Sequence, residues 1–238
     1  MQEPFPLRCA LARLTIVRHA ESVANALYAR AEQTGATGPV LDCADADVPL
    51  SEPGVRQARA TGRWLAALGP GDAPDLVLCS PCLRATRTWD LMAAQVGDPD
   101  RMPPSALTDE RLRDREAGVF ELMPPTAVRA RSPEEADRRR RVGEWHYRPP
   151  GGESPADVAL RVRDLLTELG DAAPGRRVLV VAHDVVVIAA RHVLAGIGGP
   201  APERVPVPNA SVSRWDREGT GLRLVAFGAT GHLEDLPG

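Results

Sequence analysis

The chain has 238 residues, with 29 basic and 32 acidic residues and a formal net charge of −3. This length is sufficient for one sizeable α/β domain, and we expect a single domain over residues 1–238. The near balance of charge excludes a positive field over the whole chain that would attract nucleic acid or an anionic membrane. We therefore expect a small soluble substrate, and the sequence leaves open whether the chain is a monomer or a homodimer.

All 29 basic residues are arginine, because the sequence contains no lysine. This excludes Schiff-base chemistry on a lysine and a phosphate-binding loop of the type that depends on one. The planar guanidinium group is instead suited to bidentate binding of phosphate. The composition therefore favours recognition of an anion by arginine.

The N-terminal residues 1–13 contain Arg8 and Arg13 and no continuous apolar stretch, so we expect neither a signal peptide nor a membrane span. Four cysteines in a chain of this length do not indicate a disulfide scaffold, and we expect a cytoplasmic protein. Cys79 and Cys82 have the spacing of a redox motif, but Cys79 ends an apolar stretch and the chain has no second ligand pair for zinc. We favour a structural role for this pair.

Three short apolar stretches end in polar residues and are each followed by a helical pattern. The predicted strands are 14–17, 76–79 and 177–182, and the helices that follow them are 23–31, 83–95 and 185–194. Two further helices are expected to begin at Ser51 and Ser154, and two strands are expected at 211–215 and 222–227. This alternation predicts a three-layer α/β/α sandwich around a mostly parallel central sheet.

Residues 116–152 differ from the rest because they are rich in proline and charge, and we expect them to form an inserted helical or loop cap over the sheet edge. A helix is expected at 133–141. The arginines at 138–141 could form a phosphate-binding patch, but acidic residues four positions earlier favour a solvated helix face that pairs with itself. We expect the last eleven residues to be frayed.

Ligands of open parallel sheets bind beyond the carboxyl ends of the strands. Five polar residues lie just past the ends of the predicted strands: Arg18, His19, Ser80, Arg84 and His183. We therefore expect these residues to converge at one sheet edge, near helix N-termini that favour an anion.

Five blocks of sequence in the expected order resemble one known family. The segment Arg18-His-Ala-Glu-Ser with Asn25 resembles the Arg-His-Gly motif that opens the histidine phosphatase superfamily, the phosphoglycerate mutase-like proteins. The other blocks are Leu50-Ser-Glu-Pro-Gly, Ser80-Pro-Cys-Leu-Arg-Ala, Gly151-Gly-Glu-Ser and Val180-Val-Ala-His. The resemblance extends from Leu14 to about Ser213.

The resemblance implies a phosphatase that carries the phosphoryl group on His19. Phosphoryl transfer through a covalent intermediate requires a neutral nitrogen in line with the leaving oxygen, and positive donors around the other phosphate oxygens. Arg18, Arg84 and His183 are expected to form this clamp. Neither a metal nor another cofactor is required. The further substrate-binding candidates are Asn25, Ser22, Glu21 and Arg148.

The proton donor to the leaving oxygen is ambiguous. The family has a glutamate four residues before a glycine, and Asp114 occupies that place, with a side chain shorter by one methylene group. Asp184 directly follows His183, and His-Asp resembles the acid phosphatase branch, in which that aspartate is the donor. We rank Asp114 first, Asp184 second and Glu116 third.

Three functions remain open at this point. The first is hydrolysis of a small phosphomonoester. The second is a phosphoglycerate mutase-type phosphotransferase, which is less favoured because the family's lysine in the insertion is absent, although arginines in 129–148 could replace it. The third is a phosphate-binding regulatory module with weak or no catalysis, which the substitutions at Ala20 and Asp114 keep open.

Overall fold

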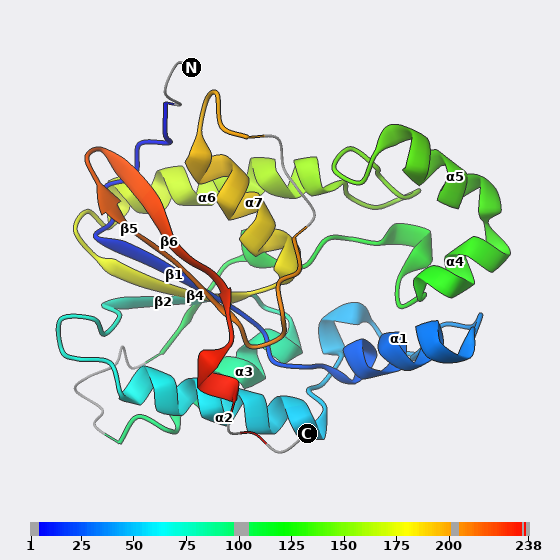
Figure 1. Cartoon of the computed structure of the whole chain (residues 1–238), viewed down its shortest axis with the longest axis horizontal. Coiled ribbons are helices and arrows are strands. Elements are labelled where there is room, and N and C mark those ends of the chain that lie inside the picture. The colour runs from blue at the N-terminus through cyan, green and yellow to red at the C-terminus, as the bar shows by residue number, and fades with distance from the viewer. Residues whose placement is uncertain (1–4, 98–104, 201–204, 235, 237–238) are drawn as a thin grey trace.

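The computed structural model describes residues 5–97, 105–200, 205–234 and 236. These residues form a six-stranded sheet with the order β3-β2-β4-β1-β5-β6 (Figure 1). The strands are β1 (Arg13–Arg18), β2 (Leu76–Cys79), β3 (Leu107–Thr108), β4 (Arg177–Ala182), β5 (Val212–Glu218) and β6 (Gly221–Ala229). The first four are parallel, and β5 and β6 are antiparallel to their neighbours, so the expected mostly parallel sheet is confirmed.

Helices cover both faces of this sheet, which confirms the three-layer sandwich (Figure 1). On one face α6 (Pro155–Ala172) and α7 (Asp184–Ala195) pack on β1 and β4 through a large apolar core. On the other face α2 (Glu52–Ala66) and α3 (Leu83–Ala93) pack on β2 and β4 around a second apolar cluster. Burial of this apolar surface is the main stabilising contribution to the fold.

Serine caps begin three of the helices and explain why they start where they do. The side chain of Ser22 accepts a hydrogen bond from the backbone of Asn25 at the start of α1 (Val23–Thr34), and Ser51 and Ser154 cap α2 and α6 in the same way. A proline in the first turn of α2 and α6 supports both starts, because its missing N–H would have no helical partner there.

Residues 116–152 contain η4 (Gly118–Phe120), α4 (Pro125–Arg131) and α5 (Pro133–Val142). Figure 1 shows α4 and α5 beyond the end of the sheet, on the side where β1 leads into α1. The helix expected at 133–141 is confirmed. Its arginines pair with nearby carboxylates, Arg138 with Glu135 at 2.7 Å and Arg139 with Glu144 at 2.6 Å. Pairing within the helix is therefore confirmed for Arg138, whereas Arg139 pairs with a carboxylate beyond the helix end, and the expected spacing of four residues is wrong.

The expectation that the last eleven residues are frayed is wrong for residues 228–234. Strand β6 continues to Ala229 and is followed by η5 (Gly231–Leu233). The ring of His232 lies 3.0 Å from the Ala210 carbonyl oxygen, so a side-chain contact anchors this segment. Residues 235, 237 and 238, and residues 1–4 of the N-terminal prediction, lie outside the described part of the chain. None of the helices described is long and apolar enough to cross a membrane.

Candidate active site

His19 lies directly after β1 and is 2% exposed. Its Nδ1 is 2.8 Å from the Ala20 carbonyl oxygen, which can only accept a hydrogen bond. Nδ1 therefore carries the proton, and the lone pair lies on Nε2. The loop is held by Asn209, whose side-chain amide donates to the His19 carbonyl oxygen at 3.1 Å. The ring is thus fixed in the tautomer that a nucleophilic Nε2 requires.

Two arginines flank this histidine. Arg18 ends β1, and its Nη1 donates to the Val207 carbonyl oxygen at 2.6 Å. Arg84, in the first turn of α3, has a side chain that is only 4% exposed. Its Nη1 donates to the Asp45 carbonyl oxygen at 2.6 Å, and its Nη2 lies 2.8 Å from Asp45 Oδ2 and 2.9 Å from Asp114 Oδ2. Both guanidinium groups are therefore held in place by oxygen atoms of the protein.

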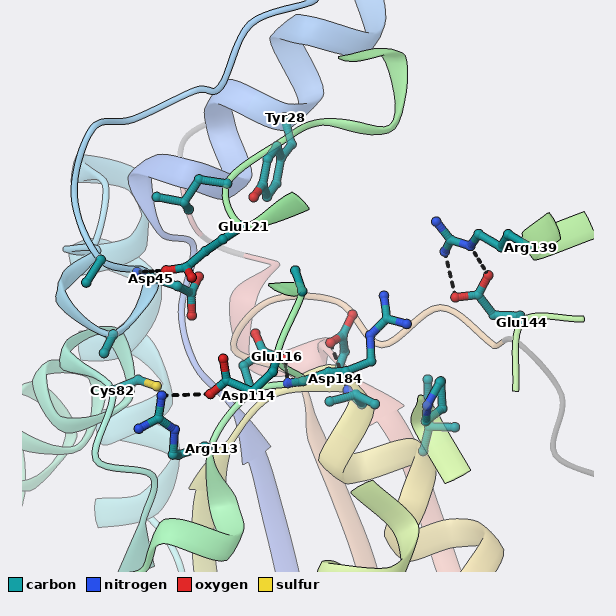
Figure 2. A pocket seen from close by; sticks show the side chains of 18 of the residues that line it. Tyr28, Asp45, Cys82, Arg113, Asp114, Glu116, Glu121, Arg139, Glu144 and Asp184 are labelled. Carbon is teal, nitrogen blue, oxygen red and sulfur yellow. Dashed lines mark hydrogen bonds and ion pairs between the residues drawn. The ribbon is translucent and has the colours of Figure 1, made fainter. Parts of the chain in front are cut away.

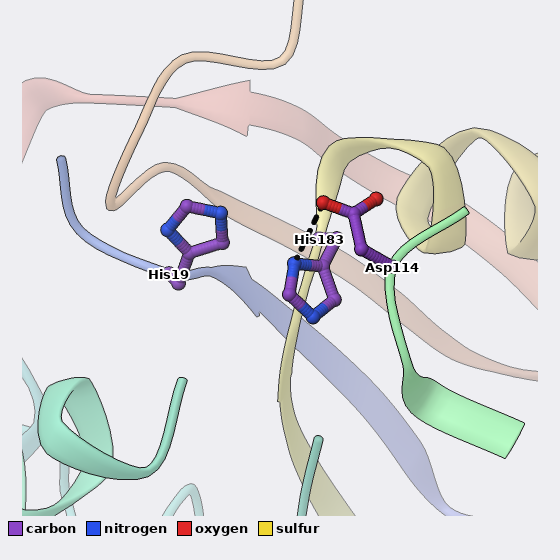
Figure 3. A group of neighbouring side chains, drawn as sticks. All are labelled: His19, Asp114 and His183. Atoms are coloured by element: carbon purple, nitrogen blue, oxygen red, sulfur yellow. Dashed lines mark ion pairs between the residues drawn. The ribbon is translucent and has the colours of Figure 1, made fainter. Parts of the chain in front are cut away.

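His183 follows β4 and completes the cluster, with its ring centroid 5.0 Å from that of His19. Its Nε2 lies 2.9 Å from Ser80 Oγ, and Ser80 itself follows β2. Its Nδ1 is 3.2 Å from Asp114 Oδ2, an ion-pair contact without hydrogen-bond geometry (Figure 3). The structure thus brings together residues from the ends of β1, β2 and β4, as the strand-end pattern predicts.

The charge states of these groups differ strongly. Burial, and then the positive charges of His183 and Arg84, lower the pKa of His19 well below its ordinary value, so its ring is neutral. Burial opposes the ionisation of Asp114, but His183 and Arg84 together hold its pKa well below the usual range. Burial likewise disfavours the charged form of His183, yet Asp114 raises its pKa. The site thus holds a neutral nucleophile beside an ionised carboxylate.

A metal ion could in principle use some of these groups. Ligand atoms of His19, Asp114 and His183 all lie within 4.8 Å of one another (Figure 3). The sequence shows no such cluster at metal spacing, because the three residues are far apart along the chain. The two guanidinium groups beside the cluster oppose the binding of a cation, since like charges repel strongly in a buried site.

The two other candidate acids are less buried than Asp114, whose side chain is 30% exposed. Asp184 is the first residue of α7, its side chain is 46% exposed, and its Oδ2 lies 3.8 Å from Arg18 Nη2. Glu116 is 47% exposed and pairs with Arg113 at 2.8 Å. Of the three, only Asp114 contacts both Arg84 and His183.

Three of the predicted substrate-binding residues make hydrogen bonds within the protein. Ser22 and Asn25 form the capping box of α1, and Asn25 Oδ1 also accepts from the Asn209 side chain. Glu21 accepts a hydrogen bond from the Ser51 hydroxyl at 2.6 Å, which ties the loop after β1 to α2.

The fourth of these candidates, Arg148, is exposed and pairs with Asp157 in the first turn of α6. The structure shows no contact of Arg148, Glu21 or Ser22 with the cavity described next. His146, in the same segment, is exposed and is not among the residues that line that cavity.

A cavity of about 540 Å³ adjoins the clamp (Figure 2). Asp114 and Cys82 form part of its lining, as do Asp184 and Glu116. Tyr28 and Glu121 lie on one side in Figure 2, and the Arg139–Glu144 pair lies on the other. This volume is within the usual range for sites of small molecules.

Sequence reasoning missed Asp45, which holds Arg84, and Asn209, which holds His19. It gave Cys82 a structural role, and the thiols of Cys79 and Cys82 are both buried and free of disulfides. Burial raises the pKa of Cys79 to about 12, which argues against a redox role for that thiol, whereas the effect of burial on Cys82 is outweighed by His183 and its pKa is lowered. A run of aspartates at 42–47 is the only local signal that could have indicated Asp45.

The family model described as the histidine phosphatase superfamily, branch 1, matches residues 14–230. The chain belongs to this superfamily. The resemblance noted from the sequence is therefore confirmed, and membership of the histidine phosphatase superfamily makes the chain an enzyme of the phosphatase type.

Among curated relatives, the chain is 28% identical over 229 residues to a probable phosphoglycerate mutase GpmB of Yersinia enterocolitica, with 93% of this chain and 94% of the relative covered. It is 29% identical over 226 residues to the protein of the same name in Erwinia tasmaniensis, with 92% and 94% covered.

Solved structures show the same histidine phosphatase fold. YhfR of Bacillus stearothermophilus has a TM-score of 0.73 at 24% identity, covering 94% of this chain and all of that one. A mycobacterial glucosyl-3-phosphoglycerate phosphatase in complex with VO3 has a TM-score of 0.71 at 25% identity, covering 92% of this chain and 100% of that one.

Proposed function

We propose that this enzyme hydrolyses a small phosphomonoester through a phosphohistidine intermediate on Nε2 of His19. The observation that carries the proposal is the state of His19. Its Nδ1 is bound to a carbonyl oxygen, its pKa is strongly lowered, and Arg18, Arg84 and His183 surround it. A neutral nucleophile inside a cluster of cationic donors is the arrangement that phosphoryl transfer requires.

The proposed reaction has two steps. In the first, the Nε2 lone pair of His19 forms the N–P bond while the bond from phosphorus to the ester oxygen breaks, and Asp114 gives its proton to the departing oxygen. In the second, Asp114 takes a proton from a water molecule, whose oxygen bonds to phosphorus as the N–P bond breaks. Inorganic phosphate leaves, and both residues return to their initial states.

Asp114 must carry a proton before the first step, although it is ionised in the empty site. Its low pKa depends on Arg84 and His183. A bound phosphoryl group would take over these cationic partners and add negative charge beside the carboxylate. Both effects raise the pKa of Asp114, so the binding of substrate itself supports protonation of the acid.

We infer that the enzyme needs no metal ion, because Arg18, Arg84 and His183 supply the positive charge around the phosphate oxygens. We also infer that residues 116–152 act as a cap that influences specificity, since Glu116, Glu121 and Glu144 from this segment line the cavity. A cytoplasmic location, as monomer or homodimer and without nucleic acid or membrane partners, agrees with the free cysteines and the net charge of −3.

The covalent intermediate provides the direct test. The enzyme is mixed with a ³²P-labelled phosphomonoester, quenched and denatured, and the protein-bound label is counted. We expect a label that is labile in acid and stable in base, and that is absent from His19→Ala. The control His146→Ala, at an exposed histidine outside the cavity, should retain it. Turnover without such a label would exclude the phosphohistidine route, and neither label nor turnover would favour the binding module.

A mutase is the second candidate, because the curated relatives named above are described as phosphoglycerate mutases. The two functions differ in the fate of the phosphoryl group. With 3-phosphoglycerate, a phosphatase releases inorganic phosphate and glycerate, whereas a mutase produces 2-phosphoglycerate. Formation of 2-phosphoglycerate faster than release of phosphate would replace our proposal with the mutase.

A further inference from the structure

The side chains that line the cavity carry more negative than positive charge. Six carboxylates and three guanidinium groups are found among the described lining residues. The carboxylates are Asp45, Asp114, Glu116, Glu121, Glu144 and Asp184. The cavity beside the positive clamp, which shares Asp45, Asp114 and Asp184 with the ion pairs of that clamp, thus has an excess of carboxylates in its walls.

Resting on the phosphatase function proposed above, we infer that the cavity selects an ester whose leaving group is uncharged and bears hydroxyl groups. A leaving group with a carboxylate or a second phosphate is disfavoured. This selection would come from the cavity walls and not from the clamp, which treats all phosphoryl groups alike.

Two of the three lining guanidinium groups are already neutralised by carboxylates of the protein. Arg139 Nε and Nη2 each donate to the Glu144 carboxylate at 2.6 Å, a bidentate pair (Figure 2). Arg113 pairs with Glu116 at 2.8 Å. Because these arginines are paired in the empty site, a substrate carboxylate would have to displace a protein carboxylate to use them.

Arg115 is the third guanidinium group, and it has no ion-pair partner among the residues described. Its Nη1 is buried without a hydrogen-bond acceptor, so only part of the group is available to a ligand. Glu121, which has no ion-pair partner among the described residues, opposes this single charge. Asp184 lies 3.8 Å from Arg18 Nη2 in the empty site, and a bound phosphoryl group would compete for that guanidinium group. Once a phosphoryl group occupies Arg18, the balance of the remaining wall charges is therefore negative, and a contact of Arg115 with a substrate carboxylate would contradict the inference.

The same walls are suited to hydroxyl groups. Carboxylate oxygens accept hydrogen bonds from hydroxyls, and Glu121 and Asp184 supply such oxygens at the cavity surface. Burial raises the pKa of Tyr28 to about 12, so its phenol stays neutral and can both donate and accept. The apolar lining residues Leu122, Trp145 and Ile188 provide a surface for the less polar side of a ligand. A cavity of about 540 Å³ accommodates a sugar or a nucleoside.

A matched pair of substrates tests this inference. Glycerol 3-phosphate and 3-phosphoglycerate differ only in a terminal hydroxymethyl group or carboxylate. We expect kcat/KM to be at least about tenfold higher for glycerol 3-phosphate, because the carboxylate meets like charge. The ratio should fall as salt is raised from 0.05 to about 0.5 M, since salt screens repulsion at a cavity open to solvent.

Isosteric variants assign the selection to the walls. The double variant of Glu121→Gln with Glu144→Gln removes two negative charges and releases Arg139, so the ratio of the two kcat/KM values should fall about three- to tenfold. The control is Glu218→Gln. This exposed carboxylate pairs with Arg223 at the C-terminal end of β5, whereas the N-terminal end of β5 lies beside the end of β1 that leads to His19. This control should leave the ratio unchanged, because the lost charge is remote from the cavity.

The outcomes separate this inference from the proposed function. Hydrolysis of nitrophenyl phosphate that depends on His19, together with equal or faster hydrolysis of 3-phosphoglycerate, would overturn the inference and leave the phosphatase intact. If hydrolysis of 3-phosphoglycerate were then lost in Arg115→Gln, this would show that Arg115 binds the substrate carboxylate. Absence of hydrolysis with all of these esters would overturn the proposed function and this inference with it.

Discussion

Asp114 is the residue on which the proposed proton transfer depends. Asp114→Asn should slow hydrolysis of an alkyl phosphate about 10²- to 10⁴-fold and that of nitrophenyl phosphate far less, because nitrophenolate leaves without a proton. The comparison is made on kcat/KM for both esters. Asp184→Asn is the matched variant, and a selective loss there with none in Asp114→Asn would make Asp184 the acid.

The contact between His183 and Asp114 also predicts a pH dependence of stability. Because Asp114 raises the pKa of His183, the protonated form stabilises the fold fully below the unfolded pKa of about 6.5, and this contribution is lost as pH rises through the folded pKa. His183→Asn should therefore lower the free energy of unfolding more at pH 6 than at pH 9, as measured by urea denaturation. A larger effect at pH 9 would contradict the raised pKa.

Individual site residues were predictable where they lie just past the end of a strand. His19, Arg84 and His183 were found in this way, because strand ends of a parallel sheet converge whatever the rest of the chain does. Asp45 and Asn209 were not, since each contacts its partner across a loop, and loop conformation has no periodic signal in the sequence. The sequence thus predicts the residues at strand ends better than the loop residues that hold their side chains in place.

At the scale of elements, the long amphipathic helices and buried strands were predicted with ends within a few residues. Their caps are local: Ser51 and Ser154 are each followed by a proline in the first turn. The two-residue strand β3 and the seven-residue helix α4 were missed, because neither is long enough to show a period. Their positions depend on packing against other elements.

The junction between α2 and the loop after β1 provides a test at this scale. A Cβ atom at Gly54 would lie 1.9 Å from the Glu21 carbonyl oxygen, so Gly54→Ala must displace either the loop or the helix start. We expect a loss of about 1–3 kcal/mol in the free energy of unfolding, measured by urea denaturation. Gly38→Ala is the control, since nothing lies within 4 Å of its Cβ position. Similar stabilities of the two variants would show that the junction is not tightly packed.

For the whole molecule, the distribution of charge matters more than its sum. The net charge is −3, yet the clamp gathers positive groups at one sheet edge. Because the proposed mechanism uses these groups in place of a metal ion, EDTA followed by gel filtration should leave kcat/KM unchanged. Metal content and activity are measured on the same sample. Loss of activity that is restored by one added divalent ion would show that the cluster of His19, Asp114 and His183 holds a functional metal.

The contact of Asp114 with Arg84 has a consequence for the end of the catalytic cycle. In the empty enzyme this carboxylate accepts a hydrogen bond from Nη2 of Arg84, one of the donors proposed for the phosphate oxygens. Inorganic phosphate therefore competes with an anion that is part of the protein and returns as soon as the product moves away. On the proposed mechanism the enzyme would exchange one anion for another at Arg84, and we expect this exchange to limit inhibition by the released phosphate.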